Sequence, residues 1–155
     1  MLKNLFTAIL ALAVPFNAFS ITLVEVSPVH FGSVSGQLGL SCSMSQFGVI
    51  SGDCDATDGE ISMGQIIVTN LPRNGTIEVI LTGSSNTSLS YSPVAELVGA
   101  KSGTAFIYDS QPVYVTSKGN GADFTINVFG NITVQSNLNL RQPYTVDYTL
   151  QVNQQ

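Results

Sequence analysis

Near its C-terminal end the chain runs Tyr144-Thr145-Val146-Asp147-Tyr148-Thr149-Leu150-Gln151-Val152. Every second residue is aromatic or aliphatic: Tyr144, Val146, Tyr148, Leu150 and Val152. Side chains alternate between the two faces of a β-strand, so this pattern predicts a half-buried strand with one apolar and one polar face. We expect a C-terminal edge strand here, and its backbone groups need a partner within the chain or in another chain.

Similar short segments recur along the rest of the chain. Apolar runs at residues 94–98, 124–128 and 132–134 are separated by turn-forming clusters, and Gly130-Asn131 is expected to break the last two apart. Asn74-Gly75 is a strong hairpin signal between residues 61–69 and 76–82. No segment of the mature chain shows a sustained 3.6-residue period. The sequence therefore predicts an all-β fold of about nine short strands, a single immunoglobulin-like or pilin-like β-sandwich, with a closed barrel as the alternative.

The first twenty residues have the pattern of a secretory signal peptide. Lys3 lies in a short basic start, an apolar run follows from Leu5 to Phe16, and Ala18-Phe19-Ser20 supplies small residues for cleavage. We therefore expect a signal peptide over residues 1–20 and one β-sandwich domain over residues 21–155. The chain is expected to be exported to the periplasm, the cell surface or an extracellular fibre, without a transmembrane segment.

Charged residues make up only 10% of the chain, and the formal net charge is −5. Without Lys3, four basic residues face ten acidic ones. A nucleic-acid-binding surface needs clustered Lys and Arg, so nucleic acid is not an expected partner.

The two cysteines, Cys42 and Cys54, are expected to form a disulfide, because an exported protein folds in an oxidising compartment. Such a bond would close a loop of about a dozen residues and stabilise the fold by roughly 3 kcal/mol. A zinc site would need two further ligands, and His30 is the only histidine. A cysteine nucleophile would need that histidine beside it in the fold.

The densest polar cluster follows Cys42 and includes four carboxylates: Asp53, Asp55, Asp58 and Glu60. Ca²⁺ prefers six to eight oxygen ligands from a flexible loop, so these residues are a candidate calcium site. The spacing differs from that of an EF-hand, and a solvated acidic loop is the simpler interpretation.

No other motif indicates catalysis. His30 has no partner at a recognisable spacing, and no Gly-x-Ser-x-Gly elbow is present. The chain has no Trp, which weakens a sugar-processing or carbohydrate-binding function, although Tyr91, Tyr108 and Tyr114 could provide aromatic platforms. We predict that the protein is not an enzyme and that it has no cofactor other than the possible calcium ion.

Several short motifs resemble an uncharacterised family of secreted bacterial β-sandwich domains that are pilin-like. They are His30-Phe31-Gly32-Ser33-Val34, Gly64-Gln65-Ile66-Ile67-Val68-Thr69-Asn70-Leu71-Pro72, Phe129-Gly130-Asn131-Ile132-Thr133-Val134 and Pro143-Tyr144-Thr145-Val146-Asp147-Tyr148-Thr149-Leu150-Gln151-Val152. The chain is more loosely similar to chaperone–usher fimbrial subunits, which also end on a strand with a nearby Tyr.

The resemblance implies a subunit or minor component of a surface fibre, with a role in cell adhesion and assembly by β-strand addition. Its partners would be other copies of the chain or fellow fibre subunits, together with a periplasmic chaperone and an usher. The candidate donor or edge strand carries Ile21, Leu23, Val24 and Val26, although Glu25 would share a face with Ile21 and Leu23. The alternative function is a monomeric periplasmic or secreted binding module that uses the acidic loop to hold calcium.

Overall fold

The computed structural model describes residues 20–55, 57, 59–118, 123–139 and 144–155. The predicted signal peptide lies outside this part of the chain except for Ser20, so its structure is not described. Within the described residues there are fourteen strands and no helix. The strands are β1 (Thr22–Ser27), β2 (His30–Phe31), β3 (Ser33–Val34), β4 (Ser41–Met44), β5 (Ile50–Gly52), β6 (Cys54–Asp55), β7 (Ile61–Ser62), β8 (Gly64–Thr69), β9 (Thr76–Gly83), β10 (Leu89–Val98), β11 (Ala105–Tyr108), β12 (Val113–Thr116), β13 (Phe124–Val134) and β14 (Tyr148–Gln154).

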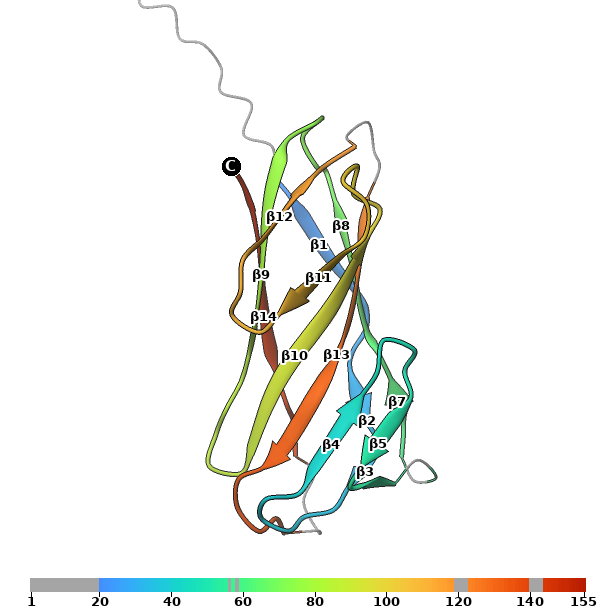
Figure 1. Cartoon of the computed structure of the whole chain (residues 1–155), viewed down its shortest axis with the longest axis vertical. Helices are drawn as coiled ribbons and strands as arrows, with labels where there is room; N and C mark the ends of the chain where they lie inside the picture. The colour runs from blue at the N-terminus through green and yellow to red at the C-terminus, as the bar shows by residue number, and fades with distance from the viewer. Residues whose placement is uncertain (1–19, 56, 58, 119–122, 140–143) are drawn as a thin grey trace, which may run out of the picture.

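Two antiparallel sheets form most of the fold. The larger one has the order β1-β8-β13-β10-β11, with β4 also paired to β13 and β5 paired to β4. The smaller one has the order β12-β9-β14. Two further pairs, β2 with β7 and β3 with β6, lie with β4 and β5 at one end of the elongated molecule (Figure 1).

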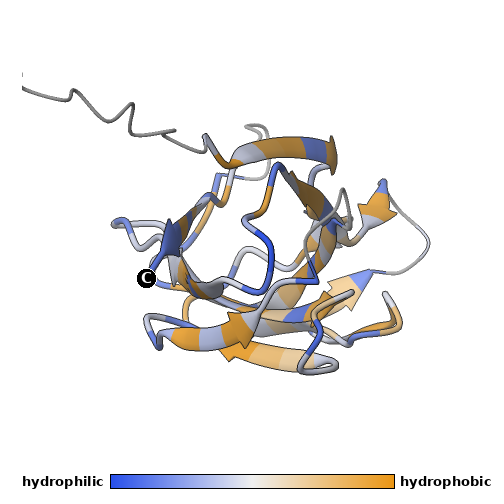
Figure 2. Cartoon of the chain, turned by 90° about the horizontal axis from the view of Figure 1, so that it is seen from above, coloured by the Kyte–Doolittle hydropathy of each residue, from blue (hydrophilic) through white to orange (hydrophobic). Residues whose placement is uncertain are grey.

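The two sheets enclose the main hydrophobic core. Strands β8, β9, β10 and β13 show alternating burial, as expected when one face of a sheet packs inward and the other faces solvent. The buried residues come from both sheets and include Val79 and Leu81 of β9 and Phe124 and Ile126 of β13. Figure 2 shows these strands surrounding a common interior. The fold is therefore all-β and sandwich-like, which confirms the predicted all-β class.

A second buried cluster lies where the long strands β10 and β13 meet the short strands β2 and β4. It contains Phe31, Met44 and Tyr91, and the Tyr91 hydroxyl donates a hydrogen bond to the Phe129 carbonyl oxygen at 2.9 Å. The predicted disulfide is present here: Cys42 of β4 and Cys54 of β6 are bonded across a sequence separation of 12. The bond fastens the short strands to the edge of the larger sheet.

The strand count differs from the expected value of about nine, partly because segments predicted as loops contain two-residue strands such as β6. Conversely, the predicted break at Gly130-Asn131 is absent, because β13 continues through both residues. β10 is also continuous and runs through Pro93. Gly130 lies opposite Pro93 and has a φ of 137°, a conformation that glycine adopts at low cost. Glycine therefore preserves the ladder at the point where the sequence suggests that it ends.

The predicted Asn74-Gly75 hairpin is also wrong. β8 and β9 flank this turn, but they belong to different sheets and do not pair with each other. Leu71, between them, is buried in the main core, and Asn70 and Asn74 both have positive φ angles. The turn therefore carries the chain across the core from the larger sheet to the smaller one.

Candidate functional site

The first strand, β1, is an edge of the larger sheet with β8 as its neighbour. Leu23 lies opposite Val68, which is 0% exposed, and Glu25 lies opposite Ile66, so both side chains belong to the inward face. Yet Leu23 is 43% exposed. An inward-facing leucine this exposed shows that no other described residue covers the sandwich at this position of β1. Val24 and Val26 are also exposed, at 48% and 54%, and Ile21 packs against the main core just before the strand.

The last strand, β14, is an edge of the smaller sheet and pairs with β9 through seven residues in unbroken register. β14 begins at Tyr148, later in the chain than the alternating pattern that starts at Tyr144. Tyr144 and Val146 precede β14, whereas Tyr148, Leu150 and Val152 lie within it. These three side chains contact the main core but remain only partly buried. Among the described residues, no strand pairs with β14 on the side away from β9.

Two observations place β14 on the same side of the molecule as β1. The Tyr148 hydroxyl oxygen lies 3.1 Å from the position that a Cβ on Gly64 would occupy, and Gly64 begins β8, the neighbour of β1. The negative charge of Glu25 also reaches the Tyr148 hydroxyl, where it raises the pKa. The β1 edge faces the β14 edge on this side of the sandwich, and we call the line between the two edges the open seam. It is bounded by Leu23, Glu25, Tyr148, Leu150 and Val152.

The opposite side of the sandwich is closed by contrast. β11 and β12 lie in contact there. The edge of β12 is occupied, because the Lys101 amide donates to the Thr116 carbonyl oxygen at 2.8 Å and the Thr116 amide donates to Ser102 Oγ at 3.3 Å. The sandwich is therefore asymmetric, with one covered side and one open seam.

Tyr148 has an unusual environment at this seam. Its hydroxyl is buried and has no hydrogen-bond partner among the described residues, and its ring packs edge-on against Tyr91 with the centroids 6.4 Å apart. Burial, with a smaller contribution from Glu25, raises the pKa of Tyr148 to about 12. The alternating pattern predicts an inward-facing aromatic residue, but it cannot predict that the hydroxyl lacks a partner.

This environment predicts a change in alkaline stability for Tyr148→Phe. The folded pKa is higher than the ordinary value of 10.0, so the unfolded chain loses the phenolic proton first. The free energy of unfolding is therefore at its full value below pH 10.0 and falls as the pH rises towards 12. Phenylalanine has no such proton to lose and leaves no unpaired hydroxyl. We expect thermal melts to show stability at neutral pH that equals or exceeds that of the natural protein, and a shallower decline above pH 10. Tyr108→Phe, at an exposed position, is the control; equal declines for all three proteins would contradict the prediction.

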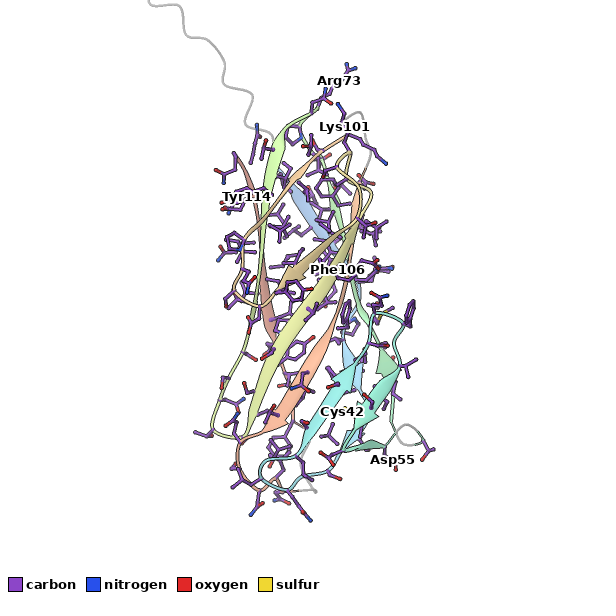
Figure 3. The ribbon with its side chains drawn as sticks, viewed as in Figure 1. Cys42, Asp55, Arg73, Lys101, Phe106 and Tyr114 are labelled. Carbon is purple, nitrogen blue, oxygen red and sulfur yellow. A yellow bond between two sulfur atoms is a disulfide. The ribbon has the colours of Figure 1, made fainter. Side chains whose placement is uncertain are left out.

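The outer face of β14 carries a polar cluster that the sequence pattern did not reveal. Glu78 of β9 accepts hydrogen bonds from Tyr114 at 2.8 Å, from Asn153 at 3.2 Å and from Gln155 at 3.1 Å. The bond to Glu78 raises the pKa of Tyr114. The cluster ties β12 and β14 to β9, and Tyr114 projects from the side of the molecule (Figure 3). Only the cross-strand register brings these residues together.

The candidate calcium ligands have separate partners. An Asp53 carboxylate oxygen accepts from the Ser41 amide at 2.9 Å, and Asp55 accepts from the Thr57 amide and hydroxyl, which lowers the Asp55 pKa. Glu60 lies 4.0 Å from His30. Asp58 is outside the described residues. Among the residues that the structure describes, no group of three potential metal ligands comes together. The calcium site stays a prediction.

No family model, curated protein or solved structure matches the chain. The resemblance to pilin-like domains therefore rests on the sequence motifs alone. In the described part of the chain, no helix has the length and apolar character needed to cross a membrane. The open seam is the feature that best distinguishes this molecule from a sandwich closed on both sides.

Proposed function

We propose that the protein is an exported bacterial structural protein, a pilin-like or fimbrial subunit or a minor component of a surface fibre that is assembled by β-strand addition. It would act without catalysis and without a cofactor, as an immunoglobulin-like sandwich whose open seam meets neighbouring subunits. A periplasmic chaperone and an usher would be its partners during assembly. The proposal rests chiefly on one observation, the 43% exposure of inward-facing Leu23 beside the free edge of β14.

A single copy of the chain leaves apolar side chains of β1 in contact with water. Leu23, Val24 and Val26 are all exposed, although they lie in strand β1. Covering apolar surface contributes roughly 25 cal/mol per Å², so an added strand at the seam would gain energy from side chains as well as from main-chain hydrogen bonds. Five of the six residues of β1 are exposed within their own chain, which makes β1 the strand most easily exchanged with a neighbour.

A covalent lock tests this exchange. Thr22 and Thr69 are cross-strand partners in β1 and β8, and antiparallel neighbours have Cα separations of about 4.5–5.5 Å, within the range of a disulfide. The double variant Thr22→Cys/Thr69→Cys should hold β1 on its own β8. We expect the mature natural protein to form long polymers in electron micrographs, and the oxidised double variant to form none.

The single variants Thr22→Cys and Thr69→Cys are the controls, because each keeps the substitution without the lock. Both should polymerise as the natural protein does. Polymers of normal length from the locked variant would rule out exchange of β1, and a natural protein that stays monomeric at all concentrations would rule out the fibre function.

A further inference from the structure

The outer strands of the two larger sheets differ in how well they are protected against pairing with another chain. β5, β11 and β12 have only three or four residues each, and the β12 edge is also covered by Lys101 and Ser102. β1 carries inward-facing Glu25, a break in register between Glu25 and Ser27, and Pro28 immediately afterwards. Inward charges, bulges, prolines and short length all block edge-to-edge pairing.

β14 has none of these protective features. It extends over seven residues, Tyr148–Gln154, without proline, charge or a break in register. Natural sheets rarely leave an edge of this kind unprotected, because it is a template for another strand. Among the five outer strands, β14 is therefore the one best suited to pair with a strand of another chain.

The direction of the free backbone groups in β14 follows from its bonds to β9. The Gln155 amide donates to the Thr76 carbonyl oxygen at 3.0 Å, and the Asp147 amide donates to Ser84 Oγ at 3.1 Å. Backbone groups of successive residues point to opposite sides of a strand, so the odd-numbered residues from 147 to 155 face β9. The N–H and C=O groups of Tyr148, Leu150, Val152 and Gln154 therefore point outward from the free edge.

We propose that two copies of this chain pair through β14, antiparallel, about a two-fold axis at Gln151. This inference rests on the proposed function, since it names the neighbour that adds to the β14 edge. Gln151 is the middle residue of the strand, so this register pairs all seven residues and joins the smaller sheets of two copies into one. The outward groups of Leu150 then bond those of Val152 in the partner, and those of Tyr148 bond those of Gln154.

The side chains match in this register as well. On the inward face, Leu150 and Val152, both partly exposed, lie opposite Val152 and Leu150 of the partner and cover each other. On the outward face, Thr149 lies opposite Asn153 and Gln151 lies opposite its own copy. All of these pairs are neutral. The contact therefore adds no like-charge repulsion between two chains that each have a formal net charge of −5.

The distribution of charge favours the antiparallel direction. Arg73 and Lys101 lie at one end of the molecule, and Asp55 of the acidic loop lies near the other (Figure 3). Antiparallel pairing turns the two acidic ends away from each other, whereas parallel pairing would set them side by side. A two-fold contact closes on itself. A fibre would therefore alternate this contact with the exchange of β1.

Single cysteines test the two-fold register. Gln151 pairs with itself at a non-hydrogen-bonded position, where Cα atoms lie about 4.5 Å apart, within disulfide range. The mature variant Gln151→Cys should give a covalent dimer as its main product under mild oxidation, visible on non-reducing gels. Thr116→Cys, on the opposite edge of the same sheet, should remain monomeric, and peptide mapping should show Cys42–Cys54 intact in both.

A second pair of variants fixes the direction. Thr149→Cys and Asn153→Cys should each cross-link poorly alone and efficiently when mixed, because each faces the other in the partner. Polymers that form while Gln151→Cys stays uncross-linked would overturn the β14 contact and leave the fibre function standing. Dimers that cross-link at Gln151 but never extend would support the contact and overturn the fibre, and a wholly monomeric protein would overturn both.

Discussion

Replacing Phe124 with alanine is expected to lower the free energy of unfolding by about 3–5 kcal/mol. Phe124 begins β13, lies opposite Val68 of β8 and is 0% exposed in the main core. Its ring fills space between the two sheets, and the alanine variant would lose this buried surface and leave a cavity that the flanking strands cannot fully close. Urea unfolding followed by circular dichroism would measure the change.

Phe47→Ala is the matched control for this substitution. Phe47 is 78% exposed, so the same chemical change removes little buried surface, and the free energy of unfolding should stay within about 0.5 kcal/mol of the natural value. If both variants lost similar amounts, Phe124 would not belong to the core that joins the sheets.

Gly99→Ala is expected to be the other strongly destabilising change. Gly99 follows β10 with a φ of 103°, and a Cβ there would lie 2.6 Å from the Asp123 carbonyl oxygen. An L-residue at positive φ costs about 1–2 kcal/mol, and forcing backbone apart adds about 1–3 kcal/mol. We expect a total loss of about 2–5 kcal/mol, measured by urea unfolding.

Gly103→Ala separates the two contributions. Gly103 has a similar φ of 96°, but a Cβ there would have nothing within 4 Å. It should therefore lose only the backbone contribution of about 1–2 kcal/mol. Equal losses at the two positions would show that the β10 end can move away from Asp123.

The local pattern of the sequence predicted individual strands and the disulfide correctly. The alternation in residues 76–82 and 124–128 predicted strands that β9 and β13 confirm, and the export context predicted the Cys42–Cys54 bond. These signals are local because inward and outward side chains alternate along one strand, whatever its neighbours are.

The pairing of strands was less predictable, since it depends on residues distant in sequence. Asn74-Gly75 suggested a hairpin, but the turn crosses between sheets because Leu71 is buried in the core. Likewise, Gly130-Asn131 predicts a break, but Gly130 lies opposite Pro93 within a continuous ladder. The open seam depends on which strands lie at the edges, and no short motif encodes that.

The central position of β13 has a consequence for the time course of folding. β13 pairs with β8, β10 and β4, and its Asn131 side chain bonds Ser43 across 88 residues of sequence. Such a topology has a high contact order, which slows folding because distant segments must meet before their contacts become favourable. Most of the chain must be available before the larger sheet can close. If the protein is exported as proposed, this delay would keep the chain unfolded, and therefore able to be threaded through a membrane, until β13 has reached the other side.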